Sequence, residues 1–165
     1  MAGLLAAPLL LAAPPATARD VLGLYDGWGA VKQAGGDPVC YAIAEPGRTT
    51  SSAKGALRRD PASLAVARYP GRQISAQVQA TLGFAADPAR DLTLAVDGRR
   101  WTLLPHGPNA YAASAQDDAA IVAALRRGAT AQVTATSTRG TRVTDSYALK
   151  GLGAALDAAA AACGK

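Results

Sequence analysis

The chain has 165 residues, with 17 Lys and Arg against 12 Asp and Glu, a formal net charge of +5, and only two cysteines and one histidine. One histidine and two distant cysteines do not make a recognisable zinc-binding set, so we predict no metal and no other cofactor. The basic excess favours anionic partners. The basic pairs at 58–59, 99–100 and 126–127 are scattered with few aromatic residues between them, which disfavours nucleic-acid binding and indicates solvated surface arginines.

Residues 1–18 have the pattern of a signal peptide. They carry no charged side chain, include an apolar run, and end in Ala-Thr-Ala, which places small residues where signal peptidase cleaves. The run is shorter than the roughly 20 residues of a membrane-spanning helix, and prolines interrupt it. We expect cleavage before Arg19 and one domain over residues 19–165. No Lys or Arg follows Met1, so either the true start lies upstream or the signal is atypical. An apolar segment buried in the fold is the alternative.

Cys40 and Cys163 are the two cysteines. In an oxidising compartment outside the cytoplasm, two cysteines most simply form one disulfide bond, and free thiols are the alternative. A redox function is disfavoured because the thiols are far apart in the sequence and no Cys-x-x-Cys is present.

Strand patterns fill the first half of the chain. Residues 28–31 and 39–43 are predicted strands around a Gly-Gly-Asp-Pro turn, and the alternation over 39–43 places Cys40 and Tyr41 on opposite faces. Residues 45–60 have no sustained period and are predicted to form a surface loop. Strands are expected at 63–69 and at 73–82, where apolar and polar residues alternate most clearly.

The second half adds two hairpins and two helices. Residues 92–96 and 99–103 flank Asp97-Gly98, a pair that accepts the positive φ angles of a type I′ turn. A loop over 105–109 and a short strand over 110–113 follow. A capped amphipathic helix is predicted over 119–127, then a hairpin of 131–137 and 142–149, then an alanine-rich helix over 152–162. The expected fold is mainly β: a single-domain antiparallel β-sandwich of seven to nine strands, with one inserted short helix and a C-terminal helix.

An ordered set of segments resembles the invasion-associated locus B family of small exported proteobacterial proteins. The segments are Gly27-Trp28, Cys40-Tyr41-Ala42-Ile43, Val96-Asp97-Gly98 followed by Trp101, the helix over 118–128, Ser137-Thr138-Arg139-Gly140-Thr141, and Asp145-Ser146-Tyr147-Ala148-Leu149-Lys150-Gly151. The resemblance implies an extracytoplasmic β-sandwich-like domain without enzymatic activity. In pathogenic members it also implies an association with the invasion of host cells.

Catalytic patterns are weak. A Ser-His-Asp system would have to use His106, but no Gly-x-Ser-x-Gly motif is present, so a loop histidine is the simpler interpretation. The candidate carboxylates for glycosidase chemistry all have ordinary structural explanations in turns, caps or exposed strand positions. They are Asp87, Asp91, Asp97 and Asp145.

A binding surface of Trp28 and Trp101 beside Arg99 and Arg100 is the candidate site, although core packing is the more common role of large aromatic residues. We expect a periplasmic or secreted, non-catalytic protein that binds an envelope or host-surface protein or glycan, with no membrane span after signal cleavage. The alternatives are a structural envelope-maintenance protein and, with less support, a small hydrolase that uses His106.

Overall fold

The computed structural model describes residues 18–164, so the predicted signal peptide, apart from Ala18, lies outside the described residues. This part of the chain forms 11 strands, two α-helices and one short 3-10 helix. The strands are β1 (Arg19–Tyr25), β2 (Trp28–Gln33), β3 (Val39–Ala44), β4 (Arg48–Ser51), β5 (Ser63–Tyr69), β6 (Ile74–Thr81), β7 (Thr93–Val96), β8 (Arg99–His106), β9 (Asn109–Ala112), β10 (Thr130–Thr136) and β11 (Arg142–Ala148). The helices are η1 (Pro70–Arg72), α1 (Ala115–Arg127) and α2 (Leu152–Cys163).

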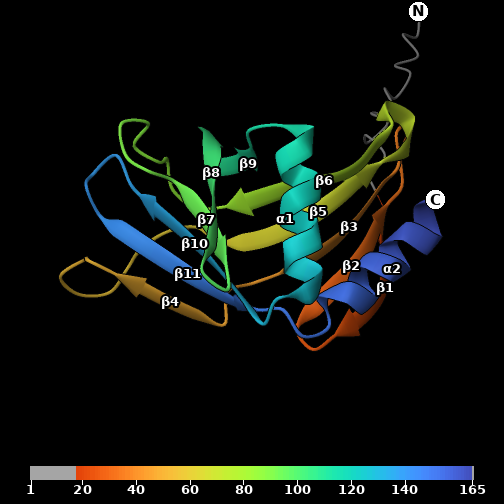
Figure 1. The fold of residues 1–165 in the computed structure, drawn as a ribbon, viewed down its shortest axis with the longest axis horizontal. Coiled ribbons are helices and arrows are strands. Elements are labelled where there is room, and N and C mark those ends of the chain that lie inside the picture. Colours follow the sequence, from red (N-terminus) through yellow and green to blue (C-terminus); the bar gives the residue numbers. More distant parts are fainter. Residues whose placement is uncertain (1–17, 165) are drawn as a thin grey trace, which may run out of the picture.

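All the strands pair antiparallel in one continuous sheet, in the order β1-β2-β3-β5-β6-β9-β8-β7-β10-β11-β4 (Figure 1). Strand β8 makes the corner of this sheet. Its residues 99–102 pair with β7, and its residues 103–106 pair with β9. A strand that passes from one layer to the other lets a single sheet fold over itself. We call β1, β2, β3, β5, β6 and β9 the first half of the sheet, and β7, β10, β11 and β4 the second half.

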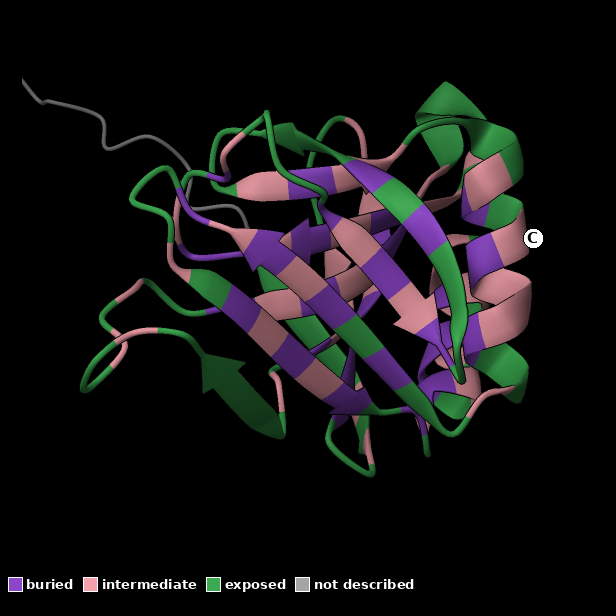
Figure 2. Ribbon diagram, turned by 60° about the vertical axis from the view of Figure 1, so that its left-hand side comes forward, coloured by how far each residue is buried: buried purple, intermediate pink, exposed green. Residues whose placement is uncertain are grey.

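The core lies between the two halves and the helices. Strand residues alternate between buried and more exposed positions, as the residue colours along β10 and β11 show in Figure 2. Polar contacts also join the halves: the Trp28 indole of β2 donates a 2.8 Å hydrogen bond to the carbonyl of Ala148 in β11. The largest fully buried side chains are Trp28, Tyr147, Leu64, Leu82, Leu94, Leu103, Ile121, Leu125 and Leu152.

Helix α2 is clamped onto the first half by one cross-strand row. Lys32, Cys40 and Arg68 lie opposite one another on β2, β3 and β5. Cys40 forms the disulfide with Cys163, with Cα atoms 5.9 Å apart, as the sequence predicted. The Lys32 ammonium donates to the carbonyl of Ala162, and the Arg68 guanidinium donates to that of Gly164. Two cations therefore satisfy carbonyls at the C-terminal end of the helix, where the helix dipole is negative.

Helix α1 packs mainly on β6 and also contacts β7, β9 and α2. Its predicted N-terminal cap is present, because the Ser114 hydroxyl accepts a 3.1 Å hydrogen bond from the Asp117 amide. Asp118 is buried, and its carboxylate accepts a 2.7 Å hydrogen bond from the amide of Val78 in β6. Burial raises the pKa of the Asp118 carboxyl, with a smaller contribution from the neighbouring Asp117.

The mainly β class, the antiparallel layers, the inserted helix and the C-terminal helix are confirmed. The strand count was too low, because β1 and β4 were not predicted. The surface loop predicted over residues 45–60 was wrong in part: the segment is largely exposed, but it contains β4, which pairs with β11, and the side chain of Arg59 is only 11% exposed. Strand β4 has no buried side chain, so its sequence lacks the alternation by which strands are recognised.

Candidate functional site

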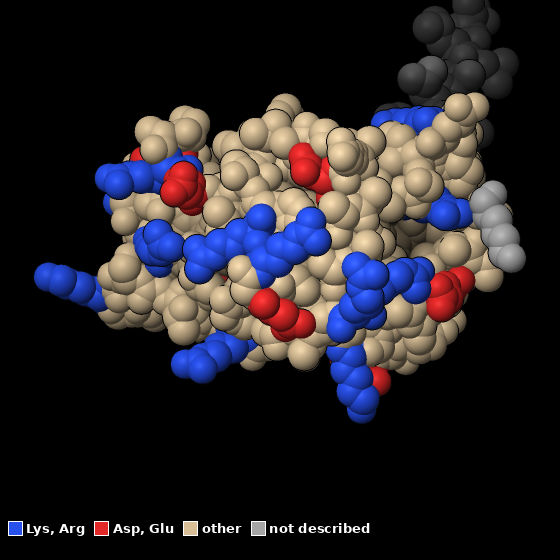
Figure 3. All heavy atoms as spheres, viewed as in Figure 1, with Lys and Arg blue, Asp and Glu red and all other residues tan. Residues whose placement is uncertain are grey.

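The outward side chains of the second half and of the adjoining part of β8 form a polar surface, which we call the hydroxyl-arginine face. Each strand places alternate residues inward, in the core, and outward, on this face. Its residues are Arg100, Thr102, Thr93, Ala95, Thr130, Gln132, Thr134, Thr136, Arg142, Thr144, Ser146, Arg48 and Thr50. Figure 3 shows Lys and Arg side chains in a band across the surface over these strands.

Five threonines form one row across this face, one on each of five neighbouring strands. Thr102 pairs with Thr93, and Thr93 pairs with Thr134. Thr134 pairs with Thr144, and Thr144 pairs with Thr50. At a strand spacing of about 4.8 Å, the row is about 19 Å long. The Thr134 and Thr144 hydroxyls lie 3.0 Å apart and share a hydrogen bond.

Arginines lie on both sides of the threonine row. On one side, Arg100 and Arg48 end the row that also holds Gln132 and Ser146. A shallow hollow of about 240 Å³ beside Arg100 is lined also by Thr130 and Gln132.

On the other side of the threonine row, Arg142 lies opposite Thr136. Both line a second hollow, of about 330 Å³, with Arg90 and two carboxylates. The carboxylates are Asp87 and Asp91. The two hollows therefore lie toward opposite ends of β10, with the threonine row between them.

This arrangement is suited to recognising a ligand that carries both hydroxyl and acidic groups. A threonine hydroxyl both donates and accepts hydrogen bonds. The guanidinium group of arginine matches a carboxylate or phosphate through two parallel hydrogen bonds. The Asp97 carboxylate, at the edge of the first hollow, is already engaged, because it accepts hydrogen bonds from the amides of Ala129 and Thr130.

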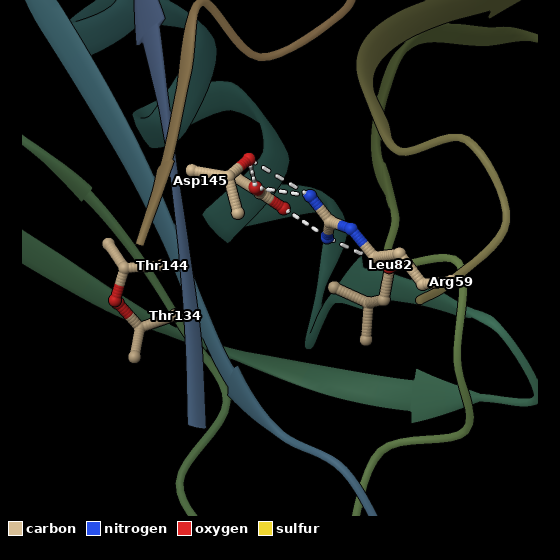
Figure 4. A network of polar contacts seen from close by, with 6 residues as sticks. Arg59, Leu82, Thr134, Thr144 and Asp145 are labelled. Carbon is tan, nitrogen blue, oxygen red and sulfur yellow. Dashed lines mark hydrogen bonds and ion pairs between the residues drawn. The ribbon is translucent and has the colours of Figure 1, made fainter. Parts of the chain in front are cut away.

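An ion pair lies on the inner side of this half of the sheet, which faces the core (Figure 4). Asp145 on β11 and Arg59 form two hydrogen bonds of 2.6 and 2.7 Å, with their side chains 3% and 11% exposed. Arg59 also donates to the carbonyl of Leu82 at the end of β6, and the Thr49 hydroxyl donates to Asp145. The interaction thus joins the second half of the sheet to the first.

Two interpretations from the sequence need correction here. Arg59 is not a solvated surface arginine, and Asp145 is not in an exposed strand position. The pairing was not visible in the sequence because the two residues are 86 positions apart. No local sequence pattern around either residue predicts a contact between them.

The structure does not bring the four predicted surface residues together. Trp28 is fully buried in the core. Trp101 points inward and is 9% exposed, with the Arg99 guanidinium 4.8 Å from the centre of its ring. Arg100 lies between Arg99 and Trp101 on β8, so its side chain points outward, away from the core, and belongs to the hydroxyl-arginine face. The threonines were missed because each belongs to a different strand, and only the register aligns them.

The other candidate residues have structural positions. His106 is exposed at the end of β8, where it pairs with Asn109 across a turn. Asp97 forms the predicted turn with Gly98, both with positive φ angles of 46° and 91°. Within residues 18–164, no three His, Cys, Asp or Glu side chains are grouped closely enough to hold a metal ion. Nor does any helix there have the length and apolarity to cross a membrane.

Comparisons with known proteins identify the family. The sequence has no significant match among curated proteins or among solved structures. The family described as "Invasion associated locus B (IalB) protein" matches residues 30–160, which cover most of the chain and nearly all of the folded sheet. The resemblance seen in the sequence is confirmed, and the chain belongs to the invasion-associated locus B family.

Proposed function

We propose that this protein is exported to the periplasm or secreted, and that it binds an acidic glycan of the bacterial envelope or of a host surface without catalysing a reaction. The hydroxyl-arginine face carries the proposal, because it presents a row of five threonines with exposed arginines on both sides. The family and the disulfide bond indicate a protein outside the cytoplasm. Glycans are the abundant hydroxyl-rich polymers there.

The chemistry of the face favours an acidic polysaccharide over an uncharged one. Arg48, Arg100 and Arg142 are exposed and extend from three different strands. A polymer with carboxylates or phosphates along its length is able to reach more than one of them, and hydroxyls between the acidic groups meet the threonines. Because these charges are exposed, binding should weaken as salt rises.

The test is calorimetric titration with polygalacturonate, which combines hydroxyls and carboxylates, and with uncharged dextran. We expect binding of the first, weakened by salt, and little binding of the second. Arg100→Ala and Arg142→Ala should each reduce affinity by up to about fivefold, the range of an exposed ion pair. The double variant should reduce it further, because the two arginines lie on opposite sides of the threonine row.

Arg72→Ala is the matched control. It removes the same charge from the turn between β5 and β6, where Arg72 pairs with Asp37 at an exposed position away from the face. If Arg72→Ala lowers affinity as much as Arg100→Ala, the binding is a general effect of net charge and the proposed site is wrong. Equal binding of dextran would contradict the role of the arginines.

Export has its own test. Intact-mass spectrometry of the protein from the envelope and the medium of its own cells should give a mass that begins at Arg19. Cys40 and Cys163 should resist alkylation until reduction. A full-length cytosolic protein with two free thiols would contradict the proposal.

A non-catalytic role is consistent with the position of His106, which is exposed at the end of β8 and beside the β8–β9 turn. His106→Ala should therefore leave polygalacturonate affinity unchanged. Loss of a hydrolytic activity in this variant, with folding retained, would favour the hydrolase.

A further inference from the structure

The outward side of the first half of the sheet has a different chemistry from the hydroxyl-arginine face. Four large apolar side chains in the described part of the chain are exposed, and three of them lie on this side. They are Val21 and Leu24 on β1, which are 68% and 79% exposed, and Leu104 on β8, which is 51% exposed. We call this surface the apolar face.

The register arranges the apolar face in two cross-strand rows. One row contains Val21, Val31, Tyr41, Ala67 and Gln77. The other contains Leu24, Gly29, Ile43, Ala65, Gln79, Tyr111 and Leu104. No member of either row is charged. Both helices pack on the opposite side of these strands, where Cys40, Ala42 and Ala44 are buried.

The absence of charge within the rows favours one kind of partner. The protein as a whole has a net charge of +5, so two copies repel each other over most of their surface. At the apolar face, a second copy meets no like charge in either row. A strongly acidic or basic partner finds no complementary group there.

The area is sufficient for a weak dimer. Seven strands at about 4.8 Å spacing, and four rows about 6.7 Å apart when one flanking row on each side is included, span roughly 29 Å by 20 Å. The flanking row beside Val21 holds the charged Arg19, opposite Gln33, so the uncharged surface is the central part of this area. Two such faces bury about 1,160 Å² in total, just above the roughly 1,000 Å² expected of a specific interface. Ala65, a small and only partly buried residue in the middle of its row, lets two sheets approach closely.

From these observations we propose that the apolar face is a self-association surface, through which two copies of this chain pack sheet against sheet. Leu24 and Leu104 lie near opposite ends of the face and provide the apolar contacts that an isolated copy leaves in water. The hydroxyl-arginine faces of both copies remain free in such a dimer. The inference is independent of the proposed glycan binding.

Sedimentation velocity of the oxidised protein, over concentrations reaching the high micromolar range, tests this. We expect a reversible monomer-dimer equilibrium. Leu24→Lys and Leu104→Lys should each raise the dissociation constant by at least about tenfold, because each replaces a buried leucine contact with a charge in the interface. Both positions are exposed in the single chain, so the variants should fold normally.

Ala85→Lys is the control, because it adds the same charge at an exposed loop position away from the apolar face. A protein that is monomeric at every concentration would overturn the proposal. So would a dimer that both leucine variants leave intact. A third outcome would also overturn it: a monomer that binds phosphatidylcholine vesicles in a flotation assay and whose binding is lost in Leu24→Lys. The apolar face would then be a lipid-binding surface.

Discussion

The two outer faces of this folded sheet meet on one strand and yet differ in kind. On β8, Thr102 belongs to the hydroxyl-arginine face and Leu104, two residues later, belongs to the apolar face. The inward residues of the same strand, Trp101 and Leu103, are both buried. Folding requires only the inward residues to be apolar, so the outward residues are free to differ. The two binding roles that we propose rest on that difference.

The variant with the largest expected effect removes the disulfide bond, and it tests whether the two faces depend on each other. The disulfide closes a loop of more than 120 residues, and chain-entropy estimates give such a bridge about 4 to 5 kcal/mol at most. The Cys40→Ser, Cys163→Ser double variant should lose stability toward urea by up to this amount.

Hydrogen exchange should then rise in α2, which the disulfide joins to β3, and in the strands β1–β3 that α2 contacts. Amides of β10 and β11 should stay protected, and polygalacturonate should still bind. Equal loss of protection in both halves would show that the two faces depend on one cooperative unit.

A second variant removes the ion pair that joins the two halves of the sheet. Arg59→Ala leaves the buried Asp145 carboxylate without its ionic partner, which typically costs about 3 to 5 kcal/mol. Urea denaturation should show this loss. Arg58→Ala, which removes an exposed arginine next to it, should change stability by less than about 0.5 kcal/mol. If the two variants lose the same stability, the ion pair does not hold the halves together.

A smaller effect concerns pH and helix α1, which lies beside β6 of the first half and β7 of the second. The raised pKa of Asp118 means that the folded state favours the protonated carboxyl. Its contribution to stability is complete below 3.8, the ordinary pKa of an aspartate carboxyl, and is lost as pH rises through the folded pKa.

Asp118→Asn keeps an oxygen that accepts from the amide of Val78 and removes the ionisation. Urea denaturation should find this variant more stable than the parent protein at neutral pH, with the difference shrinking as pH falls toward 3.8. A difference that stays constant with pH would contradict the assignment.

The smallest expected effect concerns a single hydroxyl group of the hydroxyl-arginine face. Thr144→Val removes one hydroxyl from the threonine row and the hydrogen bond with Thr134. Stability should fall by no more than about 1 kcal/mol, the range of a cross-strand pair. Polygalacturonate affinity should decrease while the monomer-dimer equilibrium is unchanged. An altered dimer with unchanged glycan affinity would reverse the roles assigned to the two faces.

The sequence predicted the parts of the fold that depend on local chemistry. Asp97-Gly98 marked its hairpin because both residues need positive φ, and Ser114 marked the start of α1 because its hydroxyl caps the helix. Strand β4 was missed because all of its side chains are exposed. The role of Arg59 was missed because its partner Asp145 is brought near only by the fold.

The two outer faces were less predictable than the fold. Trp28 and Trp101 attracted attention as large aromatic residues, but residue type alone does not say which side of a strand faces the core. The threonine row and the apolar face both depend on the register between strands distant in sequence, as between Thr50 and Thr144. Of the four residues predicted as a surface, Arg100 alone lies on the hydroxyl-arginine face.

The pairing of β4 with β11 has a consequence for the order in which the molecule assembles. Arg48 is among the early residues to leave a ribosome or an export channel, but its partner on β11, Ser146, comes almost a hundred residues later. Cys40 likewise waits for Cys163. Pairings between distant residues fold slowly. A nascent chain that stops before β11 leaves β4 unpaired and Cys40 without its partner, so synthesis of β11 and α2 is the step at which both interactions become possible.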